Sequence, residues 1–195
     1  MAAITRESLM SLEVYARERP AFRQRVIAHK KARTVHLGDH ITLLFEDELT
    51  VRYQIQEMLR IERTFEEEGI LDELHAYNPL VPDGLNLKAT MLIEFPDELE
   101  RRQWLARLIG VEDAVWLRVA GFEPVFAIAD EDMPRENAEK TSSVHFLRFE
   151  LGAERGRALM GGAMLAVGVS HDACTAALDP VPEAIRSSLC GDLRV

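Results

Sequence analysis

One acidic residue stands out because of its position in the sequence. The segment from Asp47 to Glu68 predicts a single long helix, and its strongly apolar side chains recur at helical spacing along one stripe. Glu62 falls in the middle of that stripe. A carboxylate on a face meant for the core needs a partner, a raised pKa or a chemical task. We therefore treat Glu62 as the first candidate, either as a metal ligand or general base, or as half of a buried ion pair or subunit contact.

The partners expected for Glu62 complete a candidate buried polar site. They are Tyr77, Asn78 and Lys88, or an arginine from the N-terminal region. A carboxylate-bridged di-iron centre in a helical bundle is excluded, because it requires Glu-x-x-His pairs and the chain contains none.

A second candidate site lies in the acidic segment that precedes a predicted strand. Asp130 and Asp132 are spaced to offer carboxylate oxygens to a hard cation, and His145 follows on the strand. The alternative is a solvated loop beside a histidine that is hydrogen-bonded within the core. No cofactor is predicted, although a single metal ion stays possible.

The charge of the chain is divided unevenly. The net charge is −10, but residues 1–35 carry +5 and the remainder carries −15. An acidic body repels nucleic acid and anionic lipid, which leaves the basic N-terminal arm as the region able to dock a polyanion or an acidic partner. The alternative is a solvated helix that lies on its own acidic body or on a sister subunit. The candidate docking residues are Arg23, Arg25, Lys30, Lys31 and Arg33.

The elements that must position these residues follow from periodicity and turn residues. Helices are predicted over 5–19, from Pro20 to Arg33, and over 47–68, 70–77, 96–110, 153–160 and 182–189. Strands are predicted over 35–45, with a turn or bulge at Gly38, and over 85–95, 114–120, 122–129, 144–151 and 164–170. The strands do not alternate regularly with helices, which favours an α+β fold with about six strands in a mainly antiparallel or mixed sheet covered by helices.

Length and composition set the domain organisation. A chain of 195 residues predicts a helical arm over 1–34 and a single domain over 35–195. No apolar run is long enough to cross a bilayer, and the N-terminus lacks the pattern of a signal peptide. The two cysteines are then expected to be reduced thiols in a cytoplasmic protein.

Four segments together resemble one bacterial family that is catalogued as a conserved domain of unknown function. They are RYQIQEML (52–59), AYNPL (76–80), KATMLIE (88–94) and KTSSVHFLRF (140–149). The resemblance implies genes that neighbour those of rubrerythrin and an iron–sulfur oxidoreductase, and hence an accessory role in a redox or peroxide-defence system. It supplies no catalytic residues.

Two functions are carried forward. The leading hypothesis is a non-catalytic, homodimeric accessory protein that binds a redox partner by charge complementarity. The alternative is a metal-dependent or small-ligand enzyme with a site near Glu62 or between Asp130 and His145. Whether the chain is an enzyme stays open on the sequence.

Overall fold

The structure is a computed structural model that describes residues 3–129 and 140–195. Its helices are α1 (Leu12–Lys31), α2 (Glu48–Glu62), α3 (Glu67–Tyr77), α4 (Glu98–Arg107), α5 (Gly152–Met160) and α6 (Glu183–Cys190), with 3₁₀ turns η1 (Arg6–Ser8), η2 (Asn78–Leu80) and η3 (Glu112–Ala114). Its strands are β1 (Thr34–Leu37), β2 (Ile41–Glu46), β3 (Asn86–Ile93), β4 (Val115–Val119), β5 (Val125–Phe126), β6 (Ile128–Ala129), β7 (Val144–Glu150), β8 (Leu165–His171) and β9 (Cys174–Leu178).

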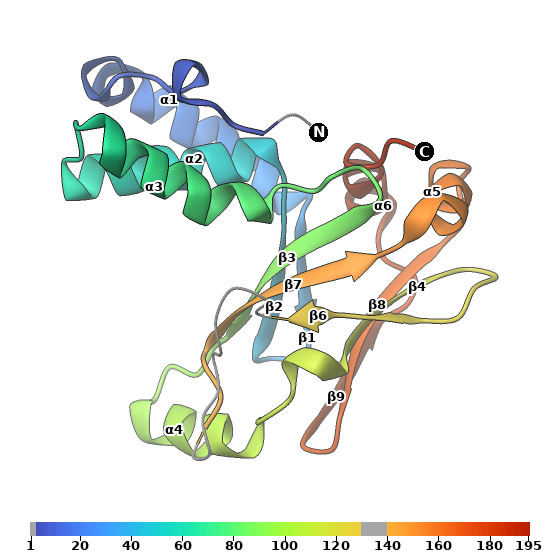
Figure 1. Ribbon diagram of the computed structural model, residues 1–195. Coiled ribbons are helices and arrows are strands. Elements are labelled where there is room, and N and C mark those ends of the chain that lie inside the picture. Colours follow the sequence, from blue (N-terminus) through green and yellow to red (C-terminus); the bar gives the residue numbers. More distant parts are fainter. Residues whose placement is uncertain (1–2, 130–139) are drawn as a thin grey trace.

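The strands form two antiparallel sheets (Figure 1). One has the order β1-β2-β3-β7-β6 and the other the order β5-β4-β8-β9. The predicted α+β class is confirmed, but the single sheet of about six strands is wrong for the described residues. The predicted strand 122–129 divides into β5 and β6, which pair in different sheets, and β9 lies in a segment for which no strand was predicted.

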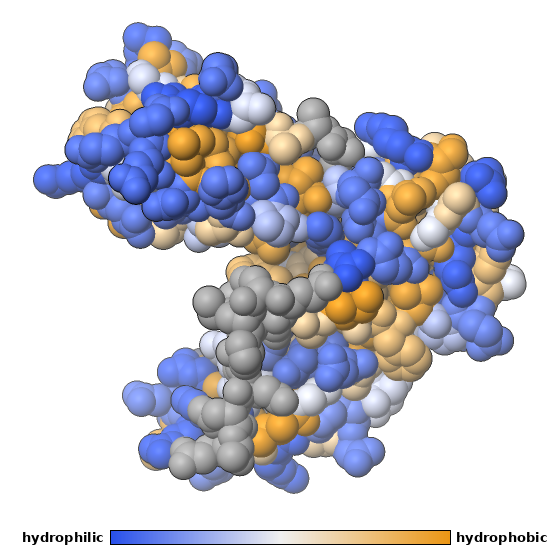
Figure 2. All heavy atoms as spheres, in the orientation of Figure 1, coloured by the Kyte–Doolittle hydropathy of each residue, from blue (hydrophilic) through white to orange (hydrophobic). Residues whose placement is uncertain are grey.

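Helices α1, α2 and α3 form a layer at one end of the five-stranded sheet (Figure 1). Between this layer and the end of the molecule that carries α4, the surface is hollowed (Figure 2). Two small apolar clusters hold the layer together. In one of them, Tyr15, Phe22 and Val26 of α1 pack against Leu49 and Tyr53 of α2.

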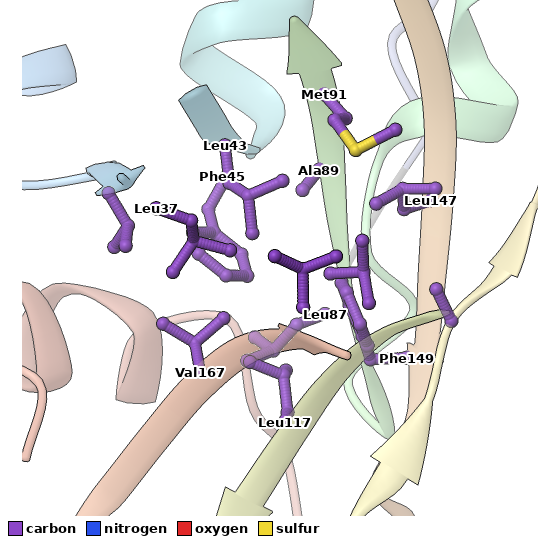
Figure 3. Close-up of a cluster of buried hydrophobic side chains, with 14 of the residues drawn as sticks. Leu37, Leu43, Phe45, Leu87, Ala89, Met91, Leu117, Leu147, Phe149 and Val167 are labelled. Atoms are coloured by element: carbon purple, nitrogen blue, oxygen red, sulfur yellow. The ribbon is translucent and has the colours of Figure 1, made fainter. Parts of the chain in front are cut away.

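The main core lies between the two sheets (Figure 3). In β3 and β7 every second side chain is buried, as the period of two in the sequence predicts. Leu87 and Ala89 of β3 and Phe149 of β7 meet Leu117 of β4 and Val167 of β8 in one continuous cluster. One apolar core therefore joins both sheets, because each presents one face of alternating apolar residues to the other.

Two predicted boundaries near the N-terminus are wrong. The helices expected over 5–19 and 20–33 are one helix, α1, which begins after the N-cap Ser11 and contains Pro20 in its interior. Proline removes one helical hydrogen bond, and the packing of Tyr15 and Phe22 on either side of Pro20 holds the helix in place. The strand expected over 35–45 is instead the β1–β2 hairpin, which Gly38 makes possible with its φ of +64°.

Candidate functional site

Glu62 is exposed, so the prediction that it occupies a buried polar site is wrong. The predicted helix over 47–68 ends at Glu62, where Arg63 adopts a left-handed conformation and donates its backbone N–H to the Leu59 carbonyl oxygen. The chain then turns and starts α3 at Glu67. The predicted position of Glu62 on an apolar stripe assumed a continuous helix, and Phe65, an apolar residue of the same predicted helix, is 61% exposed.

The turn after α2 also separates Glu62 from its expected partners. Helices α2 and α3 run side by side (Figure 1), so Tyr77 lies at the opposite end of the pair from Glu62. The eleven residues of α3 correspond to roughly 16 Å. Asn78 instead holds the N-terminal segment through two hydrogen bonds of 2.9 Å with the backbone of Ile4. Lys88 donates its Nζ to the carbonyl oxygen of Pro79.

The neighbour that Glu62 does influence is Glu73 on α3. Burial raises the pKa of Glu73, and the nearby charges of Glu62 and Asp72 raise it further. One carboxylate oxygen of Glu73 is buried with no hydrogen-bond partner among the described residues. The like charges of Glu62, Asp72 and Glu73 therefore repel one another at this contact between α2 and α3.

The second candidate site is only partly within the described residues. Asp130 and Asp132 lie outside them. His145 is fully buried on β7, where its Nε2 lies 2.9 Å from Thr141 Oγ1 and 3.0 Å from the Ser142 carbonyl oxygen. Its Nδ1 lies 3.8 Å from Oε1 of the buried Glu112. This agrees with the alternative of a hydrogen-bonded core histidine, and within residues 3–129 and 140–195 no group of three or more His, Cys, Asp and Glu side chains is placed to hold a metal ion.

Arg33 is not a docking residue, because it is 1% exposed. Its guanidinium donates to the carbonyl oxygens of Phe45 (2.9 Å) and Glu46 (3.1 Å), and it forms an ion pair with Asp192. Its Nη1 also lies 3.5 Å from Oδ2 of Asp47. This buried cluster joins the end of α1, the β2–α2 junction and the C-terminal segment.

The two aspartates of this cluster are shifted in opposite directions. Burial opposes ionisation of Asp47, but the Arg33 charge, a backbone N–H from Thr50 and His29 outweigh it and lower its pKa. His29 Nε2 lies 2.5 Å from Asp47 Oδ2. Burial is the larger effect at Asp192 and raises the pKa of that carboxyl to about 6, although Arg33 acts in the opposite direction.

Arg19 is likewise used inside the molecule. It binds both carboxylate oxygens of Glu57 on α2, at 2.7 and 2.8 Å, and the Tyr15 hydroxyl donates to the same carboxylate at 2.6 Å. The hydrogen bonds from Arg19 outweigh burial and, with Tyr15 and Arg60, lower the pKa of Glu57 to about 2. This pair fixes α1 on α2.

The remaining docking candidates on α1 are at least partly open to solvent. Arg23, Arg25 and Lys31 are exposed, and Lys30 is half-buried with its Nζ 5.8 Å from the Tyr53 ring centroid. The structure therefore divides the predicted docking set into an outer group of these four residues and one buried residue, Arg33.

Sequence reasoning missed a carboxylate that ties α2 to the five-stranded sheet. Glu46, 8% exposed at the end of β2, accepts hydrogen bonds from the hydroxyls of Thr90 (2.6 Å) and Thr50 (2.5 Å). Lys88 is its neighbour across the strand pair. The contact of Glu46 with the start of α2 depends on the fold, so the local sequence pattern held no signal for it.

The comparisons with known proteins identify a family and a similar solved structure. Residues 3–193 match the model of a family described as "Protein of unknown function (DUF3501)". A search of the curated proteins gave no match. A solved structure, described as a novel protein of unknown function from Burkholderia pseudomallei K96243, is 55% identical and has a TM-score of 0.94, covering 99% of this chain and 100% of that chain. No helix in the described part of the chain is both long and apolar enough to span a membrane.

Proposed function

This chain belongs to the DUF3501 family of proteins of unknown function, and we propose that it is a non-catalytic accessory protein that docks a partner through the outer face of α1. The observation that carries this proposal is that the basic residues of α1, together with Arg33 just after it, divide into two groups. Arg19 pairs with the half-buried Glu57 and Arg33 pairs with the buried Asp192, while Arg23, Arg25 and Lys31 are exposed to solvent.

The inner residues give the helix a fixed position. Arg19 and Arg33 each pair with a carboxylate of another segment, Glu57 and Asp192, and Tyr15 and Phe22 pack beside them. A docking surface that is held rigid loses less conformational entropy when a partner binds. The same contacts that stabilise the fold thus present the outer face of α1 in one orientation.

The outer residues give the helix its selectivity. Residues 1–35 carry +5 on a chain whose remainder carries −15. Such a surface attracts an acidic partner and disfavours approach in other orientations, and this raises the association rate more than the affinity. Docking through α1 therefore fits a transient complex with an acidic protein.

The class of partner follows from the family resemblance, which implies a cytoplasmic redox or peroxide-defence system. Rubrerythrin and an iron–sulfur oxidoreductase, whose genes the resemblance implies as neighbours, are the partners to test. In this proposal the redox chemistry belongs to the partner, and this chain positions it or assists its assembly.

The test measures binding of each purified partner to the full chain from about 20 to 300 mM salt. The triple variant R23E/R25E/K31E should slow association at low salt by roughly tenfold or more and flatten its salt dependence. The matched control R102E/R107E/R157E makes the same change in net charge at exposed arginines on α4 and α5. The control should retain most of the binding.

Two results would count against the proposal. One is the absence of a complex with either partner at the lowest salt. The other is an equal loss of binding in the two triple variants, which would mean that net charge matters and the α1 face does not. Elemental analysis of protein purified without added metal distinguishes the accessory protein from the enzyme alternative. Stoichiometric iron, zinc or manganese would favour a metal-dependent enzyme.

A further inference from the structure

The outer face of the four-stranded sheet carries a row of side chains that decreases in size across the strands. Strand pairing places Phe126 of β5 opposite Trp116 of β4, Trp116 opposite Gly168 of β8, and Gly168 opposite Ala177 of β9. The alternate residues of β4 and β8, such as Leu117 and Val167, point into the core. The outer row therefore runs from two aromatic residues at one edge to two of the smallest side chains at the other.

The large half of the row is held in place. Trp116 lies against Gly168 so closely that a Cβ on that glycine would come within 2.3 Å of the indole ring. The indole Nε1 also donates to the Ser170 hydroxyl at 2.9 Å. Beside it, Phe126 is 53% exposed. A fixed and partly exposed aromatic pair is typical of the anchor residues of protein interfaces.

Next to the row, the same face carries both signs of charge and a hollow. Arg118 of β4 pairs with Asp179, which follows β9, and the two side chains are 44% and 50% exposed. They line a hollow of about 490 Å³ together with Phe122 and Met164, and Met164 is 60% exposed. An exposed surface with apolar, cationic and anionic parts is able to complement itself.

We propose that a second copy of this chain packs on this face and forms a two-fold symmetric dimer. A two-fold axis that lies between the sheets and runs along the strands brings the β5 edge of one copy over the β9 edge of the other. Phe126 then faces the small Ala177 of the partner subunit. The large side chains of each copy thus pack against the small side chains of the other.

The charged side chains Arg118 and Asp179 also fit this two-fold symmetry. The axis preserves position along the strands and exchanges the two edges, so Arg118 of one copy comes within reach of Asp179 of the partner subunit, and the reverse holds. Each contact occurs twice, as an isologous interface requires. Stacked sheets lie about 10 Å apart, and the small side chains of Ala166 and Ala177 leave room for that spacing.

The oligomeric state of the full chain tests the dimer by sedimentation equilibrium over micromolar concentrations. Wild type should be a dimer. Ala177→Arg and Phe126→Asp should each raise the dissociation constant roughly 100-fold, because each buries an unpaired charge at the interface. Both positions are exposed in the single chain, so the variants should keep the melting temperature of the monomer. Leu99→Asp, on α4 and 72% exposed, is the control and should dimerise like wild type.

A charge exchange tests the symmetry. Arg118→Asp should weaken the dimer because it places two carboxylates opposite each other, and Asp179→Arg should do the same with two cations. The double variant R118D/D179R should restore it. A wild type that stays monomeric would overturn the proposal. So would a dimer that tolerates Ala177→Arg and Phe126→Asp, or a double variant that is as weak as the single ones.

Discussion

Neutralising Glu57 removes the carboxylate that fixes α1 on α2, and the structure gives the size of the effect. Arg19 and Tyr15 both donate to Glu57, and their hydrogen bonds lower its pKa from 4.5 to about 2. The side chain is only 13% exposed, so solvent screens the ion pair weakly. A carboxyl whose pKa is depressed in the folded state stabilises the protein at high pH and loses that contribution as the pH falls.

The magnitude follows from the two pKa values. A shift from 4.5 to about 2 corresponds to about 3 kcal/mol of stability at pH 6, and linkage leaves about 0.5 kcal/mol of it at pH 2. Glu57→Gln should therefore lower the free energy of unfolding by about 3 kcal/mol at pH 6 and by much less at pH 2.

Urea unfolding of wild type and Glu57→Gln, at half-unit steps between pH 2 and pH 6, measures the difference in their free energies of unfolding. The contributions of the other carboxyl groups are the same in both proteins and cancel in this difference. Glu48→Gln on the same helix is the control. Glu48 pairs with Arg52 at the i,i+4 spacing and is 37% exposed, so its loss should cost less than about 1 kcal/mol. A stability difference for Glu57→Gln that stays constant across the range, or that is below 1 kcal/mol at pH 6, would refute the reasoning.

Two further predictions concern buried positions. Because burial raises the pKa of Asp192 from 3.8 to about 6, the folded state binds this proton more tightly than the unfolded chain does. The stability of wild type relative to Asp192→Asn should then decline as the pH rises from about 4 to 6, which urea unfolding checks; a rise over that range would contradict the assignment. Gly168→Ala should destabilise the protein by about 1 to 3 kcal/mol and change the fluorescence of Trp116, since the new methyl group would lie 2.3 Å from the indole ring and 2.9 Å from a backbone oxygen. An unchanged free energy of unfolding would show that the indole moves freely.

Prediction from the sequence succeeded where burial alternates along one element. The strands over 86–93 and 144–150 agree with the predicted ranges to within a residue or two, because a half-buried strand must place apolar residues at every second position. It failed at chain reversals. Arg63 ends α2 in a left-handed conformation that non-glycine residues rarely adopt. Because the residue there is an arginine and not a glycine, its type did not predict the turn.

The candidate site shows the same division. The sequence identified the basic arm, which includes Arg23, Arg25 and Lys31, because charge is a property of composition. It could not separate them from Arg33, whose partner Asp192 is 159 residues away. A buried ion pair between distant segments leaves no local pattern, since either residue alone resembles a surface charge.

The sequence by itself determined the α+β class, the positions of most helices and strands, the family resemblance and the unequal distribution of charge. These properties depend on local periodicity and on sums over residues. The tertiary structure alone decided that the strands form two facing sheets, that Glu62 lies in solvent, and that Arg33 and Glu57 hold α1 in place. Each of these outcomes depends on which distant segments meet, and contact between distant segments is settled by the packing of the whole chain.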